Sequence, residues 1–305
     1  MTRKRARITI SLLMSLVMAL CFLVSGVLAS DDSLLEELDL SQLYRKYDFE
    51  TGEVTFVPRY AAPSYQNGKQ IKSTSPYIPE DAKGIIGDRT VFGNDDRLQV
   101  TNTTTSPYYG IARLVITYTD NTSATGTGFL VAPNVMLTAG HCCMSASSNA
   151  PIASFTAYLG QNETYVPMTA YLSYYYVCAN FTSFNGPDKD DYAIMVLSSS
   201  PGNTTGWFGL SYQNNMFFVT NPFTITGYPI DKTSGTMWTA SGAITECSTY
   251  VLSHIIDCYA GQSGSPIYMS NVAYGILVSE NAVENRCRRM TQEVFDWLVA
   301  QGFIS

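Results

Sequence analysis

Short apolar runs alternate with turn-forming residues from Val91 to the end of the chain. This pattern is typical of β-strands, and the runs that predict them are 112–118, 128–137, 192–197, 217–226 and 272–278. Near the C-terminus apolar residues recur at helical spacing, which predicts one helix over 291–300. Many short strands followed by a single helix favour an all-β domain built as an antiparallel barrel.

The first 29 residues have the layout of a secretory signal peptide. Basic residues precede position 8, residues 8–28 carry no charge, and Val27-Leu28-Ala29 offers small side chains before a polar stretch. Cleavage after Ala29 is therefore predicted, which makes the protein secreted and leaves it without stable membrane association. The apolar stretch is long for a signal core, so an uncleaved membrane anchor is the alternative.

Residues 30–89 form a segment with a different composition. They open with an acidic helical pattern of leucines and continue as a polar stretch rich in Ser, Pro and Tyr. Because such a stretch buries little apolar surface, it predicts a linker or a pro-segment.

The charge and the histidine and cysteine content argue against some classes of partner and ligand. The formal charge is -7, from 18 basic and 25 acidic residues, and no basic stripe lies outside the signal, which argues against nucleic acid as a partner. With two histidines and no zinc-like cysteine spacing, no metal site is expected. Six cysteines remain after removal of Cys21, and an even number in an exported chain predicts disulfides. They are Cys142, Cys143, Cys178, Cys247, Cys258 and Cys287.

The run Gly-Gln-Ser-Gly-Ser-Pro from Gly261 to Pro266 is suited to acyl transfer. Small neighbours let the Ser263 hydroxyl project, and the amides of Gly261 and Ser263 can point at the carbonyl oxygen under attack. Ser265 is the alternative nucleophile, but a proline follows it and nothing comparable precedes it. By itself the run also fits an ordinary Gly/Ser turn.

A base and its partner lie upstream of this serine. His141 follows a strand-like run at 135–138, whereas His254 alternates with apolar neighbours and is interpreted as structural. Asp191 directly precedes the apolar run 192–197, where it can hold the imidazole tautomer, and Asp190 is the alternative for this role. The thiol of Cys142 or Cys143 is rejected as nucleophile because sequence neighbours of the base cannot readily face it.

These residues resemble the chymotrypsin-like serine proteases, and more closely the bacterial glutamyl endopeptidases. The matching stretches occur in the family's order over most of residues 90–305. They are Asp95-Asp96-Arg97, Thr101 to Thr104, Thr138 to Cys142, Asp191-Tyr192, Gly227-Tyr228-Pro229, Asp231-Lys232-Thr233, Asp257 to Pro266 and Met290 to Phe295.

The resemblance implies a double antiparallel β-barrel with the site between the barrels. It implies His141 as general base, Asp191 as its orienting partner, Ser263 as nucleophile and the amides of Gly261 and Ser263 as the oxyanion hole. No cofactor is expected, and the substrates are proteins or peptides cut by a monomer. The resemblance also makes residues 30–89 a propeptide, with processing after Arg89 and a protease domain at 90–305.

Two departures from the family concern specificity and cysteines. Leu277 stands where glutamyl endopeptidases carry a pocket histidine, and Glu280 nearby would repel a glutamate of the substrate. Asp257 lies where trypsin-like enzymes keep a pocket carboxylate, so Glu-specific and Arg/Lys-specific cleavage both stay open; a structural role for Asp257 is the other possibility. Near 125–128 a cysteine of the family is missing, which leaves Cys178 as a partner for Cys142 or Cys143, and Cys258 with Cys287 as a second pair.

A protein of a different class remains as the alternative. A protease-fold protein without activity could serve binding or adhesion, and five Asn-x-Ser/Thr sequons could decorate its surface. The intact set of catalytic residues argues against it, because a binding protein has no need of all of them.

Overall fold

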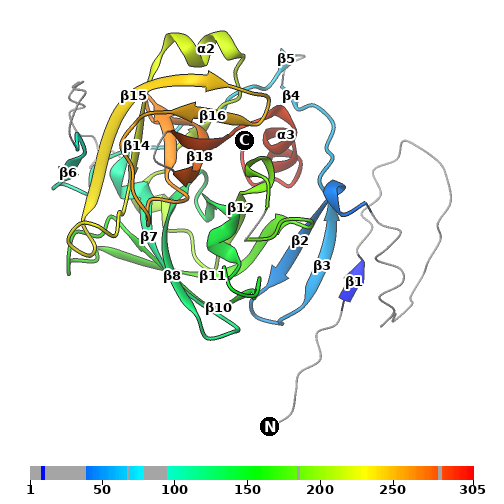
Figure 1. Cartoon of the computed structure of the whole chain (residues 1–305). Coiled ribbons are helices and arrows are strands. Elements are labelled where there is room, and N and C mark those ends of the chain that lie inside the picture. Colours follow the sequence, from blue (N-terminus) through cyan, green and yellow to red (C-terminus); the bar gives the residue numbers. More distant parts are fainter. Residues whose placement is uncertain (1–7, 11–38, 67–68, 79–94, 184–185, 281–283) are drawn as a thin grey trace.

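Two antiparallel barrels of six strands each account for most of the chain after residue 98 (Figure 1). The structure is a computed structural model that describes residues 8–10, 39–66, 69–78, 95–183, 186–280 and 284–305. This architecture confirms the all-β, double-barrel fold that the sequence and the resemblance predict.

The first barrel has the strand order β11-β10-β7-β8-β9-β12, and the pairing of β12 with β11 closes it. Its strands are β7 (Ile111–Tyr118), β8 (Ser123–Leu130), β9 (Val135–Thr138), β10 (Ile152–Leu159), β11 (Met168–Cys178) and β12 (Ala193–Leu197). Along β7 the buried residues alternate with partly exposed ones, as expected of a strand with one face on the core. All five residues of β12 are buried.

The second barrel has the order β18-β17-β14-β15-β16-β19 and is closed by the pairing of β18 with β19. Its strands are β14 (Pro222–Gly227), β15 (Met237–Cys247), β16 (Val251–His254), β17 (Pro266–Met269), β18 (Val272–Glu280) and β19 (Asn285–Arg289). Two short strands add to it, β6 (Leu98–Val100) against β15 and β13 (Gly209–Leu210) against β18.

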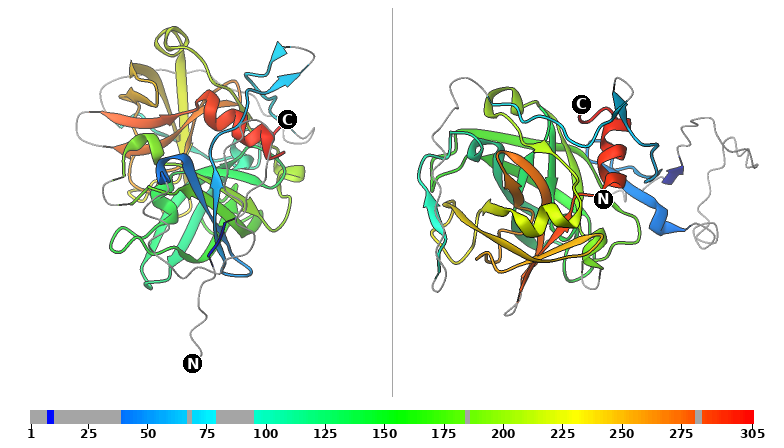
Figure 2. Two further views of the ribbon diagram at one scale, coloured as in Figure 1. Left: turned by 90° about the vertical axis from the view of Figure 1, so that its right-hand side faces the viewer. Right: turned by 90° about the horizontal axis from the view of Figure 1, so that it is seen from above.

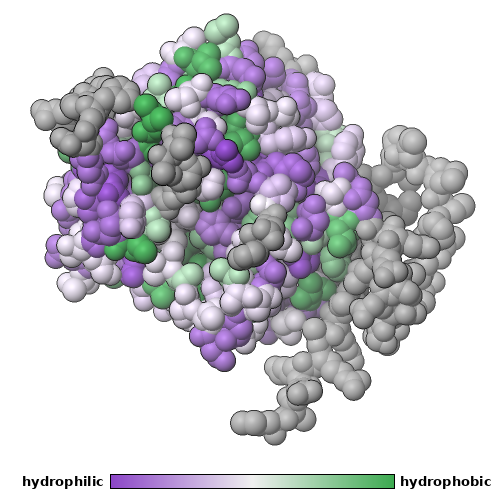
Figure 3. Space-filling model, viewed as in Figure 1, coloured by the Kyte–Doolittle hydropathy of each residue, from purple (hydrophilic) through white to green (hydrophobic). Residues whose placement is uncertain are grey.

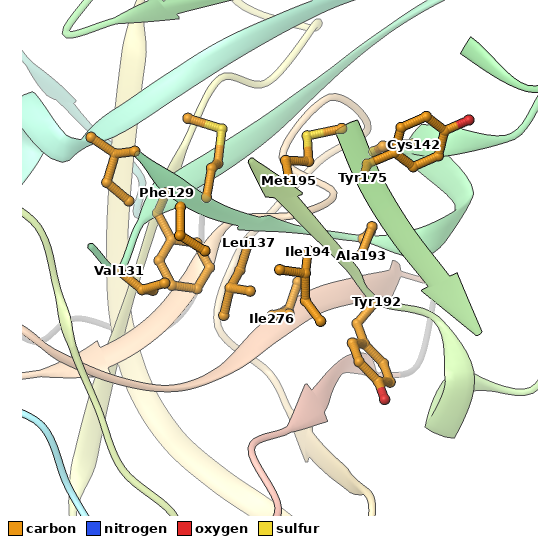
Figure 4. Close-up of a cluster of buried hydrophobic side chains, with 14 of the residues drawn as sticks. Phe129, Val131, Leu137, Cys142, Tyr175, Tyr192, Ala193, Ile194, Met195 and Ile276 are labelled. Carbon is orange, nitrogen blue, oxygen red and sulfur yellow. The ribbon is translucent and has the colours of Figure 1, made fainter. Parts of the chain in front are cut away.

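The two barrels share a continuous apolar contact. Ile276 from β18 lies beside Leu137 and Ile194 of the first barrel (Figure 4), and all three belong to one buried cluster. The face in Figure 3 is largely polar, with apolar residues in small separate patches. Because the core spans both barrels, loops from each are held at a common boundary.

Two predicted strands are partly wrong. The predicted run 128–137 is divided, because β8 ends at Leu130 and β9 begins at Val135 after a turn. Residues 217–226 contain the end of a short helix, α2 (Asn215–Thr220), before β14 begins. The side chain of Asn214 accepts a hydrogen bond from the Phe217 amide at 3.1 Å and so caps the helix. The apolar residues that follow made this stretch resemble a strand. The predicted C-terminal helix is present as α3 (Gln292–Ala300), and α1 (Gly202–Thr205) is a single turn.

The described part of the segment 30–89 buries more than its composition predicts for a linker or pro-segment, because it forms paired strands. Within it, β2 (Leu43–Asp48) pairs with β11, β3 (Val54–Pro58) pairs with β2, and β4 (Tyr65–Gln66) pairs with β5 (Lys69–Gln70). Tyr44 is fully buried in the core of the first barrel. The β2–β3 hairpin lies beside α3 (Figures 1 and 2), and the rings of Tyr44 and Trp297 are 4.5 Å apart between their centroids.

The predicted signal peptide falls mostly outside the described residues. Its described part is β1 (Ile8–Ile10), which pairs in parallel with β3. In the portion of the chain that is described, no helix has the length and apolar character needed to cross a membrane.

Candidate active site

Strand register brings His141 and Asp191 to the same edge of the first barrel. Strands β9 and β12 are antiparallel neighbours, and Thr138 lies opposite Ala193. His141 follows Thr138 in the short 3-10 turn Gly140–Cys143, and Asp191 precedes Ala193 after the turn Asp188–Asp190. His141 lies just past the end of β9, and Asp191 lies just before the start of β12. Since these two strand ends are opposite each other, the two side chains meet.

Asp191 holds His141 through two hydrogen bonds. The His141 Nδ1 and the Asp191 Oδ2 are 2.8 Å apart, and the His141 amide donates to Oδ1, also at 2.8 Å. The imidazole is 28% exposed, whereas the carboxylate is 9% exposed. Burial works to lower the pKa of His141, but the Asp191 charge and hydrogen bond outweigh it and hold that pKa well above 6.5.

The turn that carries Ser263 is anchored to the first barrel. The Ser263 carbonyl accepts a hydrogen bond from the Thr127 amide at 2.8 Å and faces the Cys142 Sγ at 3.8 Å. Gly264 has a φ of +92°, a backbone conformation that strongly favours glycine. The residue after His141 therefore contacts the turn of the predicted nucleophile.

Two amides at this turn are available for an oxyanion. Within the described residues, no acceptor takes a hydrogen bond from the amide of Gly261 or Ser263, whereas the Gln262, Gly264 and Ser265 amides are all bonded. Gly261 has a φ of +92° as well, and its carbonyl accepts from the Thr127 Oγ1 at 2.9 Å. Two unbonded amides beside a serine form a donor pair for a negatively charged oxygen.

The alternative residues have other environments. Ser265 is fully buried, whereas Ser263 is partly exposed. Asp190 forms an ion pair with Arg59, its Oδ1 3.0 Å from the Arg59 Nη1, and it also pairs with Lys189. Burial therefore favours Ser263, and pairing favours Asp191.

The three residues predicted for the specificity pocket lie in different environments. Leu277 is buried next to the nucleophile turn, where its carbonyl accepts from the Gly264 amide at 2.7 Å. Asp257 accepts a hydrogen bond from the Asp96 amide at 3.0 Å. Glu280 pairs through its backbone with Asn285 at the end of β18, and its side chain lies outside the described residues.

His254 has the structural position expected from its pattern. It is fully buried, and its Nδ1 accepts from the Ile256 amide at 3.2 Å. Burial lowers the pKa of His254 to about 4, so the ring is neutral at neutral pH. Its Nε2 contacts the Cys287 Sγ at 3.4 Å.

The disulfides expected from export are not formed in this structure, where all six described cysteines are thiols. The residue next to the Cys142 thiol is Gly126, which has no sulfur to pair with it. A Cβ built on Gly126 would lie 2.7 Å from the Cys142 Sγ. A glycine thus stands beside Cys142, within the stretch where the resembled family carries a cysteine.

The sequence did not point to several residues that support the site. Thr127 bonds both Ser263 and Gly261, and Arg97 bonds Asp231, whose neighbour Ile230 donates to the Ala260 carbonyl. Both act across more than one hundred residues of chain, so no local pattern could have revealed the contacts. The resemblance included Arg97 without assigning it a role.

Residues 100–297 match the family model described as Trypsin. Since this span is more than half of the chain, the protein belongs to the trypsin family of chymotrypsin-fold serine proteases. It is a serine endopeptidase of the glutamyl-endopeptidase-like kind.

Three known proteins are similar to large parts of this chain. A glutamyl endopeptidase of Bacillus licheniformis is 36% identical over 228 residues, which cover 70% of each chain. A solved structure of a Glu endopeptidase in complex with MPD has a TM-score of 0.60 and 27% identity, covering 70% of this chain and 99% of its own. An "Extracellular metalloprotease" of Bacillus subtilis is 31% identical over 268 residues, or 85% of each chain. In the described part of this chain, no three or more His, Cys, Asp or Glu residues are grouped to hold a metal ion.

Proposed function

We propose that this endopeptidase is exported as a precursor and works through a triad of His141, Asp191 and Ser263. The observation that carries the proposal is the paired hydrogen bonding of His141 to Asp191, beside a turn that presents Ser263 and two unbonded amides. Proteins and peptides are the substrates, and a monomer suffices because one chain holds every catalytic group.

The reaction begins when the Ser263 Oγ attacks the carbonyl carbon of the scissile peptide bond. His141 takes the hydroxyl proton on Nε2, and Asp191 stabilises the resulting imidazolium. The carbonyl oxygen becomes an oxyanion that accepts hydrogen bonds from the amides of Gly261 and Ser263. His141 then donates the proton to the leaving amine, which departs and leaves an acyl-enzyme.

The second half of the reaction uses the same groups. Water attacks the acyl carbon while His141 accepts its proton, and collapse of the second oxyanion returns that proton to the Ser263 Oγ. The products are a free carboxylate and a free amine, and the enzyme is regenerated.

A fluorophosphonate probe tests the assignment of the nucleophile. The processed wild type should be labelled on Ser263, and Ser263→Ala should lose both labelling and casein cleavage. Ser265→Ala is the matched control and should keep labelling, because that hydroxyl is buried. A processed wild type that is not labelled would instead favour the inactive binding protein.

Processing after Arg89 would leave residues 90–305, which is 216 of the 305 residues. That share is close to the 70% of this chain that the solved Glu endopeptidase covers. The cleavage point lies outside the described residues. N-terminal sequencing of the active secreted protein should show Thr90, whereas an active form beginning near Ser30 would contradict the propeptide assignment.

Export is supported by the signal-like first 29 residues and by a relative whose name includes the word extracellular. The protein should accumulate in the medium of an expressing bacterium. Recovery of the active enzyme only with the membrane fraction would favour the uncleaved anchor.

The residue preferred before the scissile bond stays open between glutamate and Arg or Lys. Leu277 brings no positive charge to bind glutamate, and the hydrogen bond of Asp257 to Asp96 favours a structural role for that carboxylate. A peptide-library cleavage profile distinguishes the possibilities. Predominant cleavage after Glu would show that a group other than residue 277 binds the glutamate, and cleavage after Arg or Lys would assign Asp257 to the pocket.

A further inference from the structure

We propose that Arg97 is a positioning residue for the oxyanion hole, acting through Asp231 and the amide of Ile230 on the peptide bond between Ala260 and Gly261. This inference rests on the proposed catalytic function. It assigns a role to a residue more than 160 positions from the nucleophile in the sequence.

Arg97 forms a bidentate ion pair with the loop between β14 and β15, residues 228–236. Its Nη1 and Nη2 bind the two carboxylate oxygens of Asp231 at 3.0 and 2.6 Å, a bidentate pair. Its Nε and Nη2 bind Asp95 at 2.8 and 2.9 Å. The Arg97 side chain is only 6% exposed, so solvent competes little for these bonds.

The loop needs this anchor because burial does not hold its tip. Ile230 is 61% exposed, and residues 231, 233 and 234 are exposed as well. A tip with little buried apolar surface is fixed mainly by its polar contacts. The bidentate bond to Asp231, the neighbour of Ile230, therefore limits how far the Ile230 amide can move.

The Ile230 amide in turn fixes one peptide plane of the nucleophile turn. It donates to the Ala260 carbonyl at 2.8 Å. In a planar trans peptide the carbonyl oxygen and the following N–H point in opposite directions. With the Ala260 oxygen held toward Ile230, the Gly261 N–H must point away from it, which leaves this amide free for an oxyanion.

The carbonyl of Gly261 is held by Thr127 of β8, and the same threonine hydroxyl bonds the loop at Tyr228. The Thr127 Oγ1 donates to the Gly261 carbonyl at 2.9 Å and accepts from the Tyr228 amide at 3.1 Å. A Cβ built on Gly261 would meet the Tyr228 oxygen at 2.6 Å and the Ile230 Cγ2 at 2.7 Å. The loop and the turn thus pack as one unit, and rotation of the 260–261 peptide would break the Ile230 bond.

The experiment compares Arg97→Gln, Arg97→Lys and Asp231→Asn with Lys232→Gln as the matched control. Lys232 pairs with Asp95 in the same network at 2.6 Å but does not bond Asp231. For each processed enzyme, kcat and KM are measured on one peptide of casein that the wild type cleaves. The rate of fluorophosphonate labelling and the melting temperature are measured in parallel.

Arg97→Gln should lower kcat roughly 10- to 100-fold with KM within about threefold, since a misaligned oxyanion donor weakens transition-state binding alone. The labelling rate should fall in parallel, and Lys232→Gln should stay within about twofold of wild type. Arg97→Lys should be nearly as poor as Arg97→Gln, because an ammonium cannot form the bidentate bond. The double variant Arg97→Gln with Asp231→Asn should be no worse than either single variant.

A folded Arg97→Gln with wild-type kcat would overturn the inference while leaving the proposed triad intact. So would a rise in KM that matches the fall in kcat, or an equal defect in Lys232→Gln. If Arg97→Gln does not fold, Asp231→Asn carries the same expectation and the same refutation. A wild type that is neither labelled nor active overturns both proposals.

Discussion

The mechanism proposed above depends on the pair of His141 and Asp191 at the scale of single residues. The Asp191 carboxylate keeps the pKa of His141 well above 6.5, and the proposed general base must be deprotonated to act, so it is half active only above that pH. We expect kcat/KM to rise with pH and to reach half its maximum above pH 6.5.

Asp191→Asn should move that midpoint to lower pH and reduce kcat roughly 1,000- to 10,000-fold, because the ring loses both the charge and the correct tautomer. The pH profile of casein-peptide cleavage measures both effects. Asp190→Asn is the control, and it should leave the midpoint in place because Asp190 pairs with Arg59 and Lys189. A midpoint shift in Asp190→Asn alone would exchange the roles of the two aspartates.

Asp257 and Asp96 give a second pH-dependent prediction. Burial and the nearby Asp257 raise the pKa of Asp96 to about 6. The folded chain therefore holds this proton more tightly than the unfolded chain, and stability is lost as pH rises from about 4 to about 6. Asp257→Asn removes the neighbouring negative charge and should reduce that loss.

Melting temperatures of wild type and Asp257→Asn test this prediction. The melting temperature of the variant, relative to that of the wild type, should be higher at pH 7 than at pH 4. The measurement at pH 4 serves as the internal control. An equal difference at both values would show that the two carboxyls do not repel each other in the fold.

Elements rather than single residues decide how the N-terminal segment behaves. Arg59, just after β3, places its Nη1 3.0 Å from Asp190 and its Nη2 3.2 Å from the Tyr192 hydroxyl. These two residues flank Asp191. The β2–β3 hairpin thus braces the turn that presents Asp191, the proposed catalytic carboxylate.

Arg59→Met should lower the free energy of unfolding by about 2–4 kcal/mol, because Asp190 stays buried with Lys189 as its remaining partner. Denaturation of the Ser263→Ala precursor measures the change without self-cleavage. Lys46→Met on β2 removes a cation–π contact with Tyr174 and should cost less than about 1 kcal/mol. Equal costs would show that the Arg59 pair carries no special weight.

Strand β8 offers a prediction about the missing disulfide. Gly126→Cys places a Cβ 2.7 Å from the Cys142 Sγ, close enough for a bond that closes a loop of about 17 residues. Oxidation should raise the unfolding free energy by roughly 3 kcal/mol. Mass spectrometry of the non-reduced protein should find the crosslink, and the Gly126→Ala control should be destabilised by crowding. A Gly126→Cys protein that keeps both thiols under oxidation would contradict the geometry.

At the scale of the whole molecule, the N-terminal segment connects distant parts. The Trp297 Nε1 donates to the Pro58 carbonyl at 2.9 Å, and the Ser64 amide donates to Asp296 at 3.0 Å. Further along, Tyr77 and Trp207 exchange backbone hydrogen bonds. The segment therefore contacts the first barrel, the connection between barrels and the C-terminal helix.

A chain of residues 90–305 with Ser263→Ala should consequently refold in lower yield than the precursor. A peptide of residues 39–78 added in trans should restore the yield, because it supplies Tyr44 and Arg59 to buried partners. The same peptide with Arg59→Met should restore less. Equal refolding with and without the peptide would show that the protease domain needs no help from the segment.

Local patterns were enough for the strands, the closing helix and the family. Period-two apolar runs specify strands wherever one face is buried, and the Gly261 to Pro266 run has the residues that a sharp turn with a projecting serine requires. The pattern failed at α2, where a capping asparagine overrode apolar content, and at the N-terminal hairpin, where a few aromatics in a polar stretch fill the core.

The sequence by itself therefore determined the fold class, the trypsin family and the candidates His141, Asp191 and Ser263. Only the tertiary structure showed that His141 pairs with Asp191 while Asp190 pairs with Arg59, gave Asp257 a backbone partner and paired Arg97 with Asp231. The physical reason is range: strand periodicity and turn chemistry act within a few residues and can be recognised along the chain. Ion pairs and orienting hydrogen bonds act between residues that only the closed barrels bring together.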